Sequence, residues 1–158
     1  MQLFLQSIKD FFSNYMLMSA LLAWLIAQII KILTGAFKNR KKSLSVILFS
    51  TGGMPSSHSA TVVSLATAAG LSHGFGSPWF AVCGVLAIIV MIDASGVRYE
   101  TGKQSKILNT LTKEFYEGKV DGANLALKEF IGHTPFQVAV GFLLGVAIAV
   151  ILFYVNWW

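Results

Sequence analysis

The chain has 158 residues, of which 55% are hydrophobic and 12% are charged. A soluble domain has roughly a quarter of its residues charged, so this composition excludes a soluble domain. It indicates a single membrane domain over residues 1–158. The net charge of +5 does not point to nucleic acid, because the basic residues cluster between apolar runs, as they do in loops on the positive side of a membrane.

The apolar runs predict an all-α, polytopic membrane helical bundle with about four spans. An interfacial helix is expected within residues 1–12, where apolar residues recur at near-helical spacing. Gly52 and Gly53 break the second span near the membrane surface, and irregular backbone at that depth must be buried or line a wet cavity. The polar segment 98–132 should form short amphipathic helices outside the membrane. The expected spans are residues 15–33, 44–71, 78–97 and 135–156.

The distribution of lysine and arginine predicts how the chain crosses the cell membrane. Nearly all of these residues lie in the loop 34–43 and the segment 98–132, whereas the loop 72–77 and the C-terminus have none. Because basic loops remain in the cytoplasm, both basic segments are expected there. The sequence therefore predicts a multi-pass protein of the cell membrane with its N-terminus outside.

The segment Gly52–Ala60 is small and polar although it lies between apolar runs. Pro55 suits the first turn of a following helix, where its missing N–H does no harm. Ser56, Ser57 and the backbone amides around them would then point toward a ligand at the helix start, which is a natural site for an anion. His58 is expected one turn inside this helix, and the anion is expected to be a phosphate.

The last span has a clear start and a small-residue packing motif. Thr134 is a good N-cap and Pro135 suits the first helical position. Gly141 and Gly145 form a G-x-x-x-G motif, which either packs within the bundle or joins two copies of the chain. Because four spans make a thin bundle, we expect a homodimer through these glycines.

The predicted topology brings several polar side chains to the cytoplasmic end of the bundle. Each of these residues lies at or near the cytoplasmic end of an expected span: Lys31, Lys38, His58, Asp93, Arg98 and His133. Each has a structural alternative. Lys31 could snorkel to the interface, and Asp93 with Arg98 could be a plain ion pair. His58 could be a buried histidine bonded to a neighbouring helix, and His133 could have no role in the loop before a helix. Their gathering at one face beside a backbone break favours a functional site.

Phosphoryl transfer through histidine is the chemistry that fits this set. One imidazole attacks phosphorus, a carboxylate holds its far nitrogen, and a second histidine protonates the leaving oxygen and then activates water. Cations and helix-end amides neutralise the phosphate oxygens. The histidines and the carboxylate could instead bind a divalent metal, but the neighbouring cations would repel it, so neither a metal nor a cofactor is expected.

The segment Met54–Ala60 resembles the P-S-G-H motif of the type 2 phosphatidic acid phosphatases, which are related to the vanadium haloperoxidases. Together with Asp93–Arg98 and Gly132–Pro135, it is similar to the divergent branch of that superfamily, which consists of short multi-span proteins, many of them bacterial. The resemblance covers almost the whole chain and implies a helical bundle. In many members the site faces outward, whereas the loop charges here place it inward.

The first two motifs of the family imply roles near the second span. Lys31 and Lys38 have the spacing of the K-x6-R-P motif, with lysine in place of arginine, and would bind phosphate. His58 stands at the histidine of the second motif, which implies that it is the general acid. Ser57 replaces the glycine of that motif, and Ser57 and Ser56 would also contact the phosphate.

The third motif of the family, S-R-x5-H-x3-D, is not intact in this chain. Two residues separate Ser95 from Arg98, and His133 lies far downstream. Gln137, four residues after His133, stands where the carboxylate is expected. Within the resemblance, His133 remains as the nucleophile, Asp93 as its partner and Arg98 as a phosphate ligand.

These expectations describe a membrane lipid-phosphate phosphatase that uses a histidine phosphoryl-enzyme. The substrate would be an amphiphile such as a phosphatidate or a polyprenyl phosphate, because a site at the membrane surface favours an anchored chain. The absent carboxylate leaves a second hypothesis open, a non-catalytic binder or transporter of a phosphorylated lipid or other anion. A structural or assembly subunit is the third alternative, and His73, in the opposite loop, has no expected role.

Overall fold

A computed structural model describes residues 1–38, 54–115 and 132–156 of the chain, and the secondary structure in these ranges is helical. The expected all-α architecture is confirmed. The helices are α1 (Gln2–Phe12), α2 (Tyr15–Lys38), α4 (Ser57–His73), α5 (Pro78–Ser95), α6 (Val97–Phe115) and α7 (Pro135–Tyr154).

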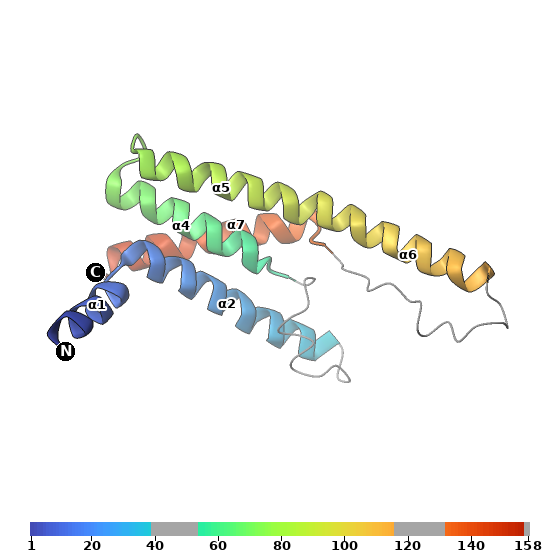
Figure 1. The fold of residues 1–158 in the computed structure, drawn as a ribbon, viewed down its shortest axis with the longest axis horizontal. Coiled ribbons are helices and arrows are strands. Elements are labelled where there is room, and N and C mark those ends of the chain that lie inside the picture. Colours follow the sequence, from blue (N-terminus) through green and yellow to red (C-terminus); the bar gives the residue numbers. More distant parts are fainter. Residues whose placement is uncertain (39–53, 116–131, 157–158) are drawn as a thin grey trace.

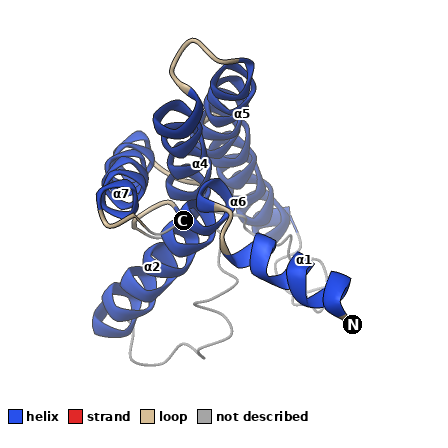
Figure 2. Ribbon diagram, turned by 90° about the vertical axis from the view of Figure 1, so that its left-hand side faces the viewer, coloured by secondary structure: helices blue, strands red, loops and turns tan. Residues whose placement is uncertain are grey.

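The helix α4 forms the centre of the bundle and packs against α2, α5 and α7 (Figure 1). The view turned by 90° shows the other three helices arranged around it (Figure 2). The amphipathic helix α1 extends away from the bundle at the N-terminus, and α6 continues the line of α5 beyond its far end (Figure 1).

Within the described ranges, three helical stretches are long and apolar enough to cross a membrane: Tyr15–Thr34, Pro78–Thr112 and Pro135–Tyr154. They correspond to the first, third and fourth expected spans. The second expected span, 44–71, is represented by α4, which has 17 residues. The glycine break at Gly52 and Gly53 and the expected helices within 116–131 lie outside the described residues.

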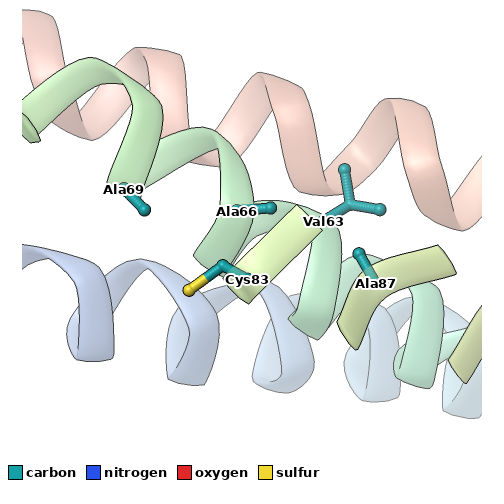
Figure 3. Close-up of a cluster of buried hydrophobic side chains, with 5 residues drawn as sticks. All are labelled: Val63, Ala66, Ala69, Cys83 and Ala87. Atoms are coloured by element: carbon teal, nitrogen blue, oxygen red, sulfur yellow. The ribbon is translucent and has the colours of Figure 1, made fainter. Parts of the chain in front are cut away.

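Small side chains line the interfaces of the central helix. Figure 3 shows Val63, Ala66 and Ala69 of α4 packed against Cys83 and Ala87 of α5, and all five are buried. A second buried cluster joins α2, α4 and α7 through Ala23, Ala27, Ala60 and Ile148. Because alanine and glycine have little bulk, the helix backbones approach closely and gain van der Waals contact without a large apolar core.

The glycine pair of α7 packs inside the bundle. A Cβ atom placed on Gly141 would lie 2.5 Å from the carbonyl oxygen of Ser56, and one on Gly145 would lie 2.5 Å from the carbonyl oxygen of Ala60. The G-x-x-x-G motif therefore packs α7 against α4 within one chain, which is the first of the two interpretations given above. A homodimer remains a prediction, and it would have to use a different face.

Several helix boundaries differ from those expected. The helix α4 begins at Ser57 rather than Pro55, because the Ser56 side chain caps it by accepting from the backbone N–H of Ser59. His58 thus lies in the first turn of α4 and not one turn inside. The third span, expected to end at residue 97, ends as α5 at Ser95, and α6 begins directly after Gly96. The cap at Thr134 and the helix start at Pro135 are confirmed.

Candidate functional site

The helix α5 finishes, and α4 and α7 begin, at one end of the bundle, and α2 runs past the start of α4 at the same end (Figure 1). Main-chain hydrogen bonds hold these ends together. The N–H of Ser56 donates to the carbonyl of Gln137 at 3.1 Å, and the N–H of His133 donates to the carbonyl of Ala94 at 3.0 Å. We call this region, with Lys31, His58, Asp93, Arg98 and His133, the polar end of the bundle.

The polar end brings together two histidines that are 75 positions apart in the sequence. The ring centroids of His58 and His133 are 6.0 Å apart, with an interplanar angle of 60°. His58 is exposed, whereas His133 is 2% exposed. At this separation the two rings are in contact, so a phosphate that reaches both imidazoles would lie beside the pair rather than between the rings. A histidine pair that reaches one phosphate has the groups needed for a nucleophile and a general acid.

The surroundings of His133 are set by the start of α7. Thr134 and Gln137 form a capping box, in which each side chain accepts from the backbone N–H of the other residue. The same Gln137 Oε1 atom lies 3.3 Å from Nδ1 of His133. From the sequence, Gln137 was identified only as the residue that replaces the carboxylate of the family motif. The pattern Thr134-x-x-Gln137 is nevertheless the signature of this capping box.

Asp93 forms an ion pair with Arg98, with 2.6 Å between the carboxylate Oδ2 and the guanidinium Nε. The two side chains are 40% and 51% exposed. The sequence assigned Asp93 as the partner of His133, but the contact described at Nδ1 of His133 is with Gln137. The reason is the helical continuation through Gly96, which brings Arg98 of α6 beside the carboxylate at the end of α5.

The cation Lys31 lies inside the bundle on α2 and is 4% exposed. This burial excludes the snorkelling alternative, in which the ammonium group would reach the interface. The charges of Lys31, Arg98 and Asp93 all act on the imidazole of His58. Lys38 is the last residue of α2, about 10 Å farther along the helix axis. The side chain of Lys38 lies outside the described atoms.

The serines at the start of α4 are buried and take part in the local helix geometry. The Ser59 hydroxyl donates to Ser56 Oγ at 3.1 Å, and Ser56 Oγ also caps the helix. The carbonyl of Ser57 accepts from the Thr61 hydroxyl at 2.7 Å. Ser56 therefore acts first as a capping residue, and its expected role as a phosphate ligand remains a prediction, as does that of Ser57.

Two further observations bound the chemistry of this region. In the parts of the chain that the structure describes, no three His, Cys, Asp or Glu side chains gather closely enough to hold a metal ion. His73 lies at the other end of α4, with its ring 6.2 Å from that of Trp79. It is separated from the other two histidines by the length of the helix.

Comparison with known proteins identifies the family of this chain. A sequence profile described as "Divergent PAP2 family" matches residues 12–148. The chain belongs to the divergent PAP2 family. A Bacillus subtilis (strain 168) protein of similar length, "Uncharacterized membrane protein YuiD", is 38% identical over 155 residues, which cover 92% of this chain and 98% of the relative. No solved structure matches. The part matched by the divergent PAP2 family includes every residue of the polar end.

Proposed function

We propose that this member of the divergent PAP2 family is a membrane lipid-phosphate phosphatase that works through a phosphohistidine. The observation that carries the proposal is the 6.0 Å separation of the His58 and His133 rings at an end of the bundle that also holds Lys31 and Arg98. Two imidazoles beside cations can transfer a phosphoryl group without a metal. The basic loops support a location of the polar end at the cytoplasmic membrane face.

The reaction proceeds in two steps. In the first, a ring nitrogen of His133 attacks phosphorus, the bond from phosphorus to the lipid oxygen breaks, and His58 gives its proton to that oxygen. In the second, His58 takes a proton from water, the water oxygen attacks the phosphohistidine, and inorganic phosphate leaves. Lys31 and Arg98 stabilise the charge that develops on the phosphate oxygens. Lys38, Ser56 and Ser57 are proposed as further phosphate ligands, and Asp93 acts by orienting Arg98.

The surface of α5 supports an amphiphilic substrate. Ile88, Ile89 and Ile92 are exposed and apolar, and they lie directly before Asp93 in the same helix. An acyl or prenyl chain lying on this lipid-facing surface would bring its phosphate to the polar end. Phosphatidate and polyprenyl phosphate both have this form.

A second function is favoured by one observation, the neutral Gln137 at the far nitrogen of His133. A carboxylate there would stabilise the positive ring of a phosphohistidine, and an amide does so less. The polar end would then bind or transport a phosphorylated lipid or other anion without hydrolysing it. Such a protein would bind phosphatidate vesicles and release no phosphate, so multiple turnovers would exclude it.

The test is phosphate release by the purified protein in lipid nanodiscs that contain phosphatidate or polyprenyl phosphate, with a chelator present. We expect His58→Ala and His133→Ala to lower the rate by at least about 100-fold. His73→Ala is the matched control, because His73 lies at the opposite end of α4, and it should retain the full rate. Full activity in both of the first two variants would end the proposal.

A further inference from the structure

Gln137 contacts both of the helix starts that carry the histidines. Its side-chain Oε1 accepts from the backbone N–H of Thr134 at 3.1 Å and lies 3.3 Å from Nδ1 of His133. Its main-chain carbonyl accepts from the N–H of Ser56 at 3.1 Å, and Ser56 is the N-cap of the helix that bears His58. One residue is thus bonded to the segments that hold both imidazoles.

The capping contact identifies the atoms involved. An amide side chain has one acceptor oxygen and one donor nitrogen, and the atom that faces the N–H of Thr134 must be the oxygen. This oxygen cannot donate, so Nδ1 of His133 can form a hydrogen bond with it only by carrying the proton. The lone pair of the neutral ring is then on Nε2.

We propose that Gln137 is the positioning residue of the site: its side chain holds His133 as the Nδ1–H tautomer with the lone pair on Nε2, and its main-chain carbonyl fixes the start of α4 relative to that ring. The inference rests on the proposed function as far as the reaction is concerned, while the tautomer can be measured without it. The close approach of Gly141 to the Ser56 carbonyl, one helical turn later, allows the main-chain bond to form.

The same contact explains how an amide at position 137 can replace a carboxylate in orienting His133. The amide oxygen supplies the geometry that a carboxylate would give, since both accept from Nδ1–H. It does not supply the negative charge that would stabilise the ring once it is phosphorylated. Glutamate can form the same capping box as glutamine, so Gln137→Glu retains both contacts and adds that charge.

The test compares three variants of the full chain in nanodiscs by ¹⁵N NMR of the histidine rings and by phosphate release. Gln137→Met removes the acceptor at nearly constant volume, and Gln137→Glu retains it. Thr134→Ala removes one hydrogen bond of the capping box but leaves the Gln137 oxygen in place. It therefore controls for a simple loss of helix capping.

We expect a protonated Nδ1 in the wild type, in Gln137→Glu and in Thr134→Ala, and a shift toward protonated Nε2 in Gln137→Met. The kcat of Gln137→Met should fall by about 10-fold or more with little change in KM, by analogy with the loss seen when a hydrogen-bond partner that orients a metal-binding histidine is removed. Gln137→Glu should equal or exceed the wild-type rate.

A wild-type ring protonated on Nε2, or a Gln137→Met ring that keeps the wild-type tautomer, would overturn the inference. An equal shift in Thr134→Ala would also overturn it, because capping alone would then explain the effect. If Nδ1 carries the proton and loses it in Gln137→Met, but no preparation releases phosphate, the positioning contact is supported and only the proposed function fails.

Discussion

The backbone N–H of His133 donates to the carbonyl of Ala94 at 3.0 Å, which joins the loop before α7 to the last turn of α5. This bond ties the backbone of His133 to the residue that follows Asp93, although the two segments are far apart in the sequence. Gly132, the residue before His133, lies directly against the backbone of Tyr99. The position of His133 therefore depends on backbone contacts as much as on its own side chain.

Gly132→Ala should displace His133. A Cβ atom at this position would lie 2.6 Å from the carbonyl carbon of Arg98 and 2.5 Å from Cα of Tyr99, and neither backbone atom can move easily. We expect a loss of stability of about 1–3 kcal/mol, the usual effect of overpacking, together with a large loss of phosphate release. Thermal unfolding in detergent and the phosphate assay measure the two effects. Gly84→Ala, which has open space around its Cβ inside α5, should leave phosphate release unchanged and should not lower stability, because alanine favours the helix by up to about 1 kcal/mol.

Gly141→Ala should separate α7 from α4. The added methyl group would lie 2.5 Å from the Ser56 carbonyl oxygen and 3.0 Å from Cβ of Ser59, so the helices must move apart. We expect a loss of about 1–3 kcal/mol and a longer distance between the two histidines. Spin labels on α4 and α7 would report the separation. Leu143→Ala, on the exposed side of the same helix, is the control and should not change the distance. An unchanged distance in Gly141→Ala would contradict the packing described here.

The sequence was sufficient for the helices but not for the contacts between them. Hydrophobic runs, caps such as Thr134 and the small residues of α7 act locally, so the apolar helices could be inferred in type and approximate position. The helix α6 differs, because it is one helix of 19 residues from Val97 where short helices were expected. The start of α4 was displaced by two residues, because Pro55 and Ser56 are both good helix-start residues and only the side-chain bond of Ser56 decides between them.

The contact of Gln137 with His133 was missed for a different reason, and Asp93 as a partner of this histidine remains a prediction. Asp93 and Gln137 are both near His133 in the fold, and a preference for a carboxylate beside a catalytic histidine favoured Asp93. In the structure α6 follows α5 directly, so Arg98 lies beside Asp93 and forms an ion pair with it. The capping box at the start of α7 places the side chain of Gln137 beside the imidazole. Both are consequences of three-dimensional packing, although the capping-box pattern was readable in advance.

Arg98→Ala should weaken substrate binding with little effect on the fold. The Asp93–Arg98 pair is about half exposed, and exposed ion pairs contribute roughly 0–1 kcal/mol to stability. If Arg98 contacts phosphate, its removal should raise KM by about 10-fold, because a charge-assisted hydrogen bond to the substrate is lost. Lys103→Ala on the same helix is the control, since Lys103 is exposed and pairs with Glu100. Equal KM values in the two variants would exclude a phosphate-binding role for Arg98.

Lys31→Met tests whether the buried cation of α2 serves the site. Methionine keeps the length and the apolar stem of the side chain but removes the positive charge, so the packing of α2 against α4 should persist. A lysine that is 4% exposed loses most of its hydration, and an anion beside it would regain part of that interaction. We therefore expect affinity for a phosphorylated lipid to fall by about 10-fold or more, equivalent to about 1.4 kcal/mol.

Vesicle binding measured with phosphatidate and with phosphatidylcholine separates this effect from general membrane affinity. Lys9→Met on α1, at the other end of the bundle, removes the same charge from an exposed position and should leave phosphatidate binding unchanged. Wild-type affinity in Lys31→Met would show that the buried lysine serves the structure of the bundle and not the anion.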